Sequence, residues 1–284
     1  MFWQTARWQI DLSRPRVMGI VNVTPDSFSD GGQHHATRDA LAHCEQLIKD
    51  GADILDIGAE STRPGATPVG VELELERLIP VIQAASSMGV AISVDTYKPQ
   101  VMQAALDAGA DILNDIWGFR QLGSLQVVAA HPNCGLCTMH MHGEPITMQS
   151  SPMQGDVTLQ VQHFLQTQAA WLVSAGVNAS RICLDPGYGF GKTVNQNFTL
   201  LAQQQQIADL GFPVLAGWSR KSSLGVVTGC EVHERLIPSV TAAVLAAERG
   251  AHVLRVHDVK ETCQALKVWQ ALKSANLSQS SNNF

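Results

Sequence analysis

The strongest constraint on the fold is a junction that recurs along the chain, in which a glycine ends a helix-like stretch and leads directly into a short apolar run. A glycine that follows a helix can adopt the left-handed backbone conformation that closes the helix. The chain is therefore predicted to alternate between helices and strands. The junction glycines are Gly51, Gly89, Gly109, Gly176, Gly211 and Gly250.

The apolar runs are short and nearly continuous, with amphipathic stretches between them. This pattern is typical of parallel strands that are covered by helices on both faces of a sheet. Two further runs bring the number to eight, at residues 17–23, 54–57, 91–94, 112–113, 136–141, 182–184, 214–216 and 253–254. Eight units predict an α/β fold of the (β/α)8 TIM-barrel type, with a doubly wound open sheet as the alternative.

Polar residues stand where the apolar runs end, and they favour the barrel. In a barrel the carboxyl ends of all strands converge on one mouth, whereas an open sheet spreads them along an edge. A converging set of polar groups is what an active site needs. The residues are Asn22, Glu60, Asp95, Asn114, His140, His142, Asp185, Ser219, Lys221, Arg255 and His257.

No linker divides the 284 residues, so the sequence predicts a single domain over residues 1–284. The barrel is expected over about residues 15–275. Residues 3–12 alternate enough to form a short N-terminal hairpin that closes the bottom of the barrel. Residues 276–284 are polar and are expected to be a frayed tail.

Composition and charge exclude several classes of partner. A net charge of −6 argues against a broad nucleic-acid-binding surface. No run approaches 18 consecutive apolar residues, and the N-terminus opens no signal-peptide pattern, so no membrane partner is expected. The six cysteines are scattered over a chain that is large enough to need no disulfides. A cytoplasmic location is the expectation.

Three short motifs allow more than one interpretation. Residues 187–193 are glycine-rich, but Pro186 stands where a P-loop needs glycine, so a loop that lets its backbone approach a ligand is favoured. Cys134 and Cys137 have the spacing of a zinc or redox half-site, although a structural role is favoured because no second pair matches. His140 and His142 are expected on one side of a strand, as a hydrogen-bonded pair or as metal ligands.

Two groups of polar residues indicate the kind of ligand. Asp95, Asn114 and Asp185 each end an apolar strand, where they could cap helices or pair with cations, or could recognise a flat, hydrogen-bond-rich heterocycle. The second interpretation is favoured because three such residues occupy equivalent barrel positions. A positive mouth on an acidic protein suits a small phosphorylated substrate, with ordinary salt bridges as the alternative. Its residues are Arg63, Lys221, Arg255 and His257.

Several of these segments together resemble the bacterial dihydropteroate synthases. Residues 18–32 (MGIVNVTPDSFSDGG) are similar to the first signature of that family, and residues 56–66 (DIGAESTRPGA) to the second. The resemblance continues through residues 93–96, 114–116, 185–187, 219–222 and 255–257. It spans all eight predicted strands.

The resemblance implies a transferase of folate biosynthesis. Such an enzyme joins 6-hydroxymethyl-7,8-dihydropterin diphosphate to p-aminobenzoate, releases diphosphate, and is a target of sulfonamides. By resemblance, Asn22 is expected to bind Mg2+, and Thr62, Arg255 and His257 to contact the diphosphate. The family further suggests a homodimer, with the late helices as the expected interface.

The resemblance also assigns the two ring-binding pockets. The pterin is expected to lie against Asp95, Asn114, Asp185 and Lys221, and Phe190 is expected to bind substrate. The p-aminobenzoate is expected to be framed by Phe28, Ser61, Arg63, Pro64, Ser219 and Ser222. Asp30 is expected to shield a pterin-stabilised cation. The residues predicted to be catalytic are Asp30, Arg63, Lys221, Arg255 and His257.

The chemistry of these residue types suits the reaction. One carboxylate can accept two adjacent pterin N–H donors, a task for Asp185, and Lys221 can donate to the ring. Alternatives are a pterin-binding methyltransferase domain, a non-catalytic or drug-bypassing relative, and an aldolase that forms a Schiff base through Lys221. The two long signature loops and the pair Arg255 and His257 count against the methyltransferase.

Overall fold

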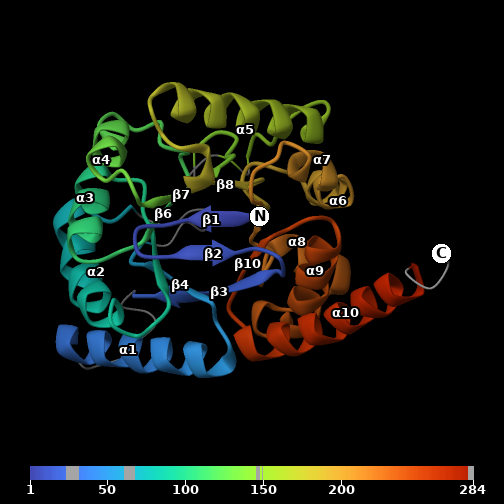
Figure 1. The fold of residues 1–284 in the computed structure, drawn as a ribbon, viewed down its shortest axis with the longest axis horizontal. Helices are drawn as coiled ribbons and strands as arrows, with labels where there is room; N and C mark the ends of the chain where they lie inside the picture. The colour runs from blue at the N-terminus through green and yellow to red at the C-terminus, as the bar shows by residue number, and fades with distance from the viewer. Residues whose placement is uncertain (24–31, 61–67, 145–147, 149, 281–284) are drawn as a thin grey trace.

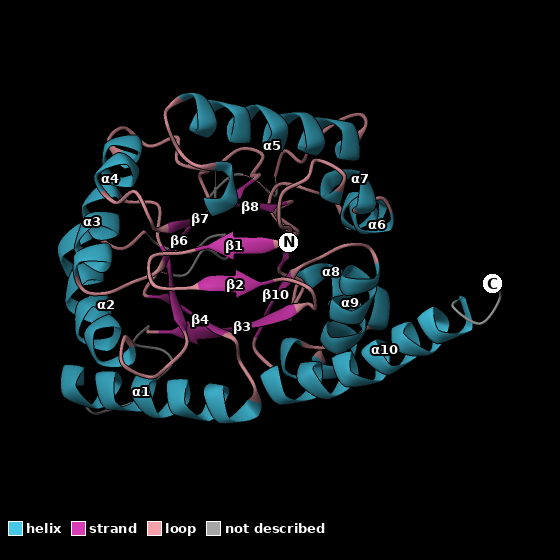
Figure 2. Ribbon diagram, in the orientation of Figure 1, coloured by secondary structure: helices cyan, strands magenta, loops and turns pink. Residues whose placement is uncertain are grey.

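The junction glycines close helices as expected, because all six have a positive φ, between +80° and +108°. The structure is a computed structural model and describes residues 1–23, 32–60, 68–144, 148 and 150–280, with only the backbone for 32–35 and 276–280. Each closed helix returns the chain to the start of the next strand. The described helices form a ring around the strands (Figure 1, Figure 2).

The strands form the predicted parallel barrel. Their order is β8-β7-β6-β5-β4-β3-β10-β9, and a parallel bridge between Leu184 and Val214 joins β8 to the segment that enters β9. The (β/α)8 barrel is therefore confirmed. The strands are β3 (Arg16–Asn22), β4 (Ile54–Gly58), β5 (Ala91–Asp95), β6 (Ile112–Asp115), β7 (Gly135–Met139), β8 (Ile182–Asp185), β9 (Leu215–Ala216) and β10 (Val253–Val256).

Ten α-helices occur in the described part of the chain, and some barrel units carry more than one. They are α1 (Gly32–Asp50), α2 (Val71–Ala85), α3 (Pro99–Asp107), α4 (Ser124–Ala130), α5 (Val157–Ser174), α6 (Val194–Ala202), α7 (Gln205–Ala208), α8 (Ser222–Thr228), α9 (Leu236–Glu248) and α10 (Val259–Ser280). Because α10 continues to Ser280, residues 276–280 are helical rather than part of a frayed tail. None of the described helices is long and apolar enough to cross a membrane.

The expected N-terminal hairpin lies across the amino ends of the strands (Figure 1). Its strands β1 (Phe2–Gln4) and β2 (Gln9–Asp11) pair antiparallel. Trp3 is fully buried, and its indole Nε1 donates to the carbonyl of Arg181 at 2.8 Å. Ala6 N also bonds the carbonyl of Asp111, at the entrance to β6. The hairpin thus closes the bottom of the barrel.

The barrel interior is layered, and the layers explain where the polar residues lie. Trp3 rests on an apolar bottom layer of Met18, Ile54, Ala91, Ile112, Cys137, Cys183, Leu215 and Val253. Side chains on a strand alternate, so the residues two positions further on also point inward, one layer higher. These are Ile20, Asp56, Ser93, Asn114, Met139, Asp185, Gly217 and Arg255. Polar side chains replace apolar ones in this second layer, so the site begins there.

Candidate active site

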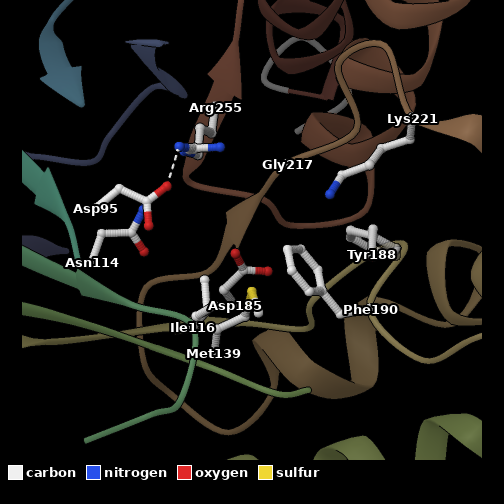
Figure 3. A pocket seen from close by; sticks show the side chains of 10 residues that line it. All are labelled: Asp95, Asn114, Ile116, Met139, Asp185, Tyr188, Phe190, Gly217, Lys221 and Arg255. Atoms are coloured by element: carbon white, nitrogen blue, oxygen red, sulfur yellow. Dashed lines mark hydrogen bonds and ion pairs between the residues drawn. The ribbon is translucent and has the colours of Figure 1, made fainter. Parts of the chain in front are cut away.

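A cavity opens at the carboxyl ends of the strands, directly above the apolar layer. Its volume is about 350 Å³, including its opening to solvent. Figure 3 shows Arg255, Asp95 and Asn114 on one side, and Lys221 with Phe190 and Tyr188 on the other. The lining residues are Asp95, Asn114, Ile116, Met139, Asp185, Tyr188, Phe190, Gly217, Lys221 and Arg255. The structure therefore brings together the predicted heterocycle-binding residues and two of the predicted cations.

Arg255 links two carboxylates across the barrel. It stands on β10, and its Nε donates to Asp56 Oδ2 at 2.5 Å while one terminal nitrogen donates to Asp95 Oδ2 at 2.6 Å (Figure 3). Burial raises the pKa of Asp95 to about 7, although Arg255 acts in the opposite direction. Much of the positive charge of Arg255 is thus compensated, so the predicted positive mouth contains an ion-pair network at this position.

Asp185 ends β8 at the floor of the cavity (Figure 3). Its Oδ1 accepts from Gly187 N at 2.7 Å, which ties the carboxylate to the loop that follows. Burial raises its pKa, while Gly187 N, Lys221 and Arg255 lower it. The Gly187 N–H therefore holds the carboxylate in position, and Lys221 and Arg255 favour its charged form.

Lys221 faces Asp185 from the loop after β9 (Figure 3). Its Nζ lies 4.3 Å from the centroid of the Phe190 ring, within the range of a cation–π interaction. The preceding residue, Arg220, has a φ of +58°, which is strained for a side chain of this size. A bond from Arg220 N to Ser239 Oγ and an ion pair with Asp258 hold this turn.

The glycine-rich loop after β8 packs against the protein itself. A Cβ at Gly187 would lie 1.9 Å from His140 O, and one at Gly191 would lie 2.3 Å from His142 O. Both glycines have a φ of +68°. The expected approach of backbone to a ligand is therefore not the reason for these two glycines. They let the loop lie directly on the segment after β7.

That segment corrects a prediction about the histidines. The strand was expected over residues 136–141, but β7 ends at Met139, so His140 and His142 do not share a strand face. His140 is buried, and its Nδ1 lies 3.0 Å from Nζ of Lys192. Burial, with Lys192 next, lowers the pKa of His140 to about 2, so the imidazole is neutral.

Lys192 was not predicted as part of the site and is almost completely buried. Besides His140, its Nζ donates to the carbonyls of Gly187 at 2.8 Å and Phe190 at 3.2 Å. Burial lowers its pKa to about 7. Lys192 therefore fastens the loop that carries Phe190 to the segment after β7.

His257 lies beside Ser219 at the mouth. Its Nδ1 is 2.9 Å from Ser219 Oγ, and its backbone N donates to the same oxygen at 3.1 Å. Ser222 is exposed at the start of α8, and Asn22 is exposed at the end of β3. Glu60 pairs with Lys98 and Tyr97 beside the barrel, away from the cavity lining.

Six predicted residues lie outside the described residues: Phe28, Asp30, Ser61, Thr62, Arg63 and Pro64. Within the described ranges, no group of three or more His, Cys, Asp or Glu side chains could hold a metal ion. The metal interpretation of His140 and His142 therefore gains no support. The six cysteines are free thiols, and Cys134 and Cys137 are buried.

Sequence reasoning missed Asp56, although a signal was present. This carboxylate interrupts the apolar run 54–57, and it stands two residues after a member of the bottom layer. Met139 and Gly217 occupy the same inward layer and line the cavity. Counting inward positions along each strand would have identified all three. Tyr188 and Ile116, which follow the strands, carry no such signal.

Comparisons with known proteins identify relatives of this chain that share its fold. A family model described as pterin binding enzyme matches residues 18–257. The dihydropteroate synthase of Escherichia coli (strain K12) is 48% identical over 267 residues, 94% of each chain. The structure of Burkholderia cenocepacia dihydropteroate synthase complexed with 7,8-dihydropteroate has a TM-score of 0.90 at 50% identity and covers 98% of both chains. Xanthomonas albilineans dihydropteroate synthase with 4-aminobenzoic acid has a TM-score of 0.88 at 50% identity, covering 93% of this chain and 95% of that one.

Proposed function

The chain belongs to the pterin binding enzyme family, and from this membership we infer that it catalyses the dihydropteroate synthase reaction. In this reaction the amine of p-aminobenzoate forms a bond to the hydroxymethyl carbon of 6-hydroxymethyl-7,8-dihydropterin diphosphate. The bond from that carbon to the diphosphate oxygen breaks, diphosphate leaves, and the amine nitrogen loses one proton. The product is 7,8-dihydropteroate, an intermediate of folate biosynthesis. The match to synthases over most of the chain favours this reaction over methyl transfer.

The observation that carries the proposal is the set of polar groups around one cavity. Asp95, Asn114 and Asp185 supply acceptors, and Lys221 supplies a donor. We propose that Asp185 accepts from the 2-amino group and the adjacent ring N–H of the pterin. Ile116, Met139 and Phe190 provide the apolar surfaces on which a flat ring can lie.

The departing diphosphate needs positive charge, and we assign this role to Arg255 and His257. Arg255 has Nε and one terminal nitrogen on carboxylates, so its other terminal nitrogen would meet a phosphoryl oxygen. Ser219 Oγ lies 2.9 Å from Nδ1 of His257 and orients the imidazole, which would donate to the leaving group. Thr62 would contact the same group, as the resemblance implies.

The site of the second substrate remains a proposal. Phe28, Ser61, Arg63 and Pro64 are assigned to p-aminobenzoate together with Ser219 and Ser222, and Ser222 is exposed at the start of α8. Asp30 is assigned to the stabilisation of a cationic pterin. The aromatic amine is a neutral nucleophile, so no strong general base is required of these residues.

Magnesium is also a proposal. Asn22 offers one hard oxygen donor at the exposed end of β3, and Mg2+ is commonly held by one or two protein oxygens together with substrate phosphates and water. This donor set fits an ion that arrives on the diphosphate. When bound, Mg2+ would neutralise charge on the leaving oxygens.

A homodimer is proposed from the exposed apolar residues of the late helices. α9 contacts both α8 and α10, and the three helices lie on one side of the barrel (Figure 1). Their most exposed large apolar residues are Val226, Val227, Ile237, Val268 and Leu272. Light scattering should give twice the chain mass for the wild type and a single chain mass for Ile237→Asp combined with Val268→Asp. Leu159→Asp, on α5, is the control. A monomeric wild type would refute the dimer.

The proposed reaction is tested with the purified chain, Mg2+, the dihydropterin diphosphate and p-aminobenzoate. Dihydropteroate and diphosphate should appear in equal amounts. Omission of each component in turn gives the controls. If neither product forms, the proposed reaction is wrong.

The cytoplasmic location is likewise a proposal, supported by the free thiols of all six cysteines.

A further inference from the structure

Asp56 is a buried carboxylate at the centre of the site, yet it does not line the cavity. It stands on β4, opposite Ser93 of β5. Every hydrogen bond described for it comes from a side chain on another strand. A charge in such a position needs a reason, because burying a carboxylate is costly unless it is paired.

Three side chains donate to this carboxylate. Oδ1 accepts from Ser93 Oγ at 2.6 Å, and Oδ2 accepts from Arg255 Nε at 2.5 Å. The amide Nδ2 of Asn114 lies 3.2 Å from Oδ2 and 3.4 Å from Oδ1. The carboxylate of Asp56, paired with a guanidinium, acts as an acceptor toward all three side chains.

The orientation of the Asn114 amide follows from this chemistry. An amide has a donor side and an acceptor side, and an acceptor-only neighbour takes the donor side. Asn114 must therefore direct Nδ2 to Asp56 and present its oxygen elsewhere. Asn114 lines the cavity, and Figure 3 shows its amide oxygen turned away from Arg255. Asn114 consequently presents a hydrogen-bond acceptor, its amide oxygen, to the cavity.

We propose that Asp56 is a positioning residue that makes the pocket select the reduced pterin ring. The inference rests on the proposed reaction, whose substrate is a 7,8-dihydropterin. The dihydro ring carries an N–H at position 8, whereas the oxidised ring carries a lone pair there. An acceptor fixed at Asn114 suits the N–H and opposes the lone pair, because two acceptors facing each other leave both unsatisfied.

The test compares 6-hydroxymethyl-7,8-dihydropterin with 6-hydroxymethylpterin by calorimetry under anaerobic conditions. The wild type should bind the reduced ring about tenfold to a hundredfold more tightly, the range expected for one buried unsatisfied group. Asp56→Asn can turn its own N–H2 toward Asn114, which frees the Asn114 amide to flip. The preference should then fall to about twofold or less.

Two further variants separate positioning from a merely structural role. The exchange Asp56→Asn with Asn114→Asp restores one donor facing one acceptor and keeps the same charge, so the preference for the reduced ring should return. Ser93→Ala removes a different donor from Asp56 and leaves its charge, so this matched control should keep the wild-type preference. Far-ultraviolet circular dichroism verifies that each variant is folded.

The outcomes are distinguishable. Equal affinity of the wild type for both rings, or an unchanged preference in folded Asp56→Asn, overturns the role of Asp56 while product formation still supports the reaction. If Asp56→Asn does not fold, the exchange variant decides: it should keep the preference, and its absence there overturns the inference. A wild type that binds neither ring and forms no product refutes the proposed reaction itself.

Discussion

At the scale of single residues, Asp185 is the most direct test of the pterin pocket. Asp185→Asn replaces one acceptor oxygen by a donor that faces the donors of the pterin. We expect binding of a neutral pterin analogue to weaken by about 2–4 kcal/mol, with a much smaller effect on diphosphate binding. Calorimetry with each ligand measures both effects. Wild-type affinity for the analogue would remove Asp185 from the pocket.

Arg255 has two roles in this geometry, and its removal should affect both. Arg255→Ala leaves Asp56 and Asp95 buried without their cation. We expect turnover to collapse and, in addition, the affinity for a neutral pterin analogue to fall at least about tenfold, because the carboxylates would repel each other. Arg255→Lys keeps the charge and should recover part of the affinity. An alanine variant that binds the analogue normally would restrict Arg255 to the leaving group.

His140 predicts a pH dependence of folding. Its pKa is about 2 in the folded protein, because of burial and then Lys192, against an ordinary value near 6.5 in the unfolded chain. Below pH 6.5 the unfolded chain binds a proton that the folded protein does not, so stability falls as the pH falls, by about 1.4 kcal/mol per pH unit.

In the variant His140→Gln, the slope of the unfolding free energy against pH should therefore be shallower between pH 6 and pH 4. The difference should correspond to about one proton, or about 1.4 kcal/mol per pH unit. Glutamine can still accept from Lys192, and the carboxyl groups contribute equally in both proteins. Urea unfolding across this pH range gives the two slopes. His163→Gln, at an exposed position of α5, is the control and should keep the wild-type slope. Parallel slopes for wild type and His140→Gln would contradict the assignment.

At the scale of elements, the loop after β8 depends on direct contact with the segment after β7. Gly187→Ala would place a methyl group against His140 O, so the loop must move. Gly187 N would then release Asp185, and we expect a loss of more than about 3 kcal/mol of stability together with loss of pterin binding.

Gly176→Ala provides a matched control for that change. Gly176 also has a positive φ, at +94°, but a Cβ there meets no atom within 4 Å. Its substitution should cost about 1 kcal/mol, the conformational penalty alone, and should leave pterin binding intact. Urea unfolding and calorimetry on both variants separate contact from conformation. Equal losses in the two variants would show that the close approach is unimportant.

At the scale of the whole molecule, the barrel was predictable because its signals are local. The glycine junctions and apolar runs depend only on neighbouring residues, and so do the polar ends such as Asp95 and Asp185. The end of β7 was placed two residues too late because Met141 continues the apolar pattern, whereas the actual end depends on packing against residues 187–191. Lys192 was missed for the same reason. Its partner His140 lies 52 residues earlier in the chain, and a single charged residue carries no sign of its burial.

The hairpin at the bottom contributes stability without touching the site. Trp3→Ala should cost about 3–5 kcal/mol, because it removes a fully buried indole and its bond to Arg181 O. In the fraction that stays folded, kcat should be unchanged. Trp8→Ala, where the side chain is 37% exposed, should cost much less. Urea unfolding measures the loss of stability and activity assays measure kcat. A large change in kcat would contradict the inference that the bottom of the barrel does not affect the site at its mouth.

The same hairpin imposes an order on synthesis. The residues of the hairpin leave the ribosome before their partners do, because Trp3 bonds a carbonyl 178 residues further on and Arg7 bonds a carboxylate 104 residues further on. These contacts cannot form before Asp111 and Arg181 have emerged. The hairpin is thus seated long after it is made, and the Trp3 indole cannot reach its buried position until Arg181 has emerged. Until then, the apolar surface of this indole is exposed to aggregation.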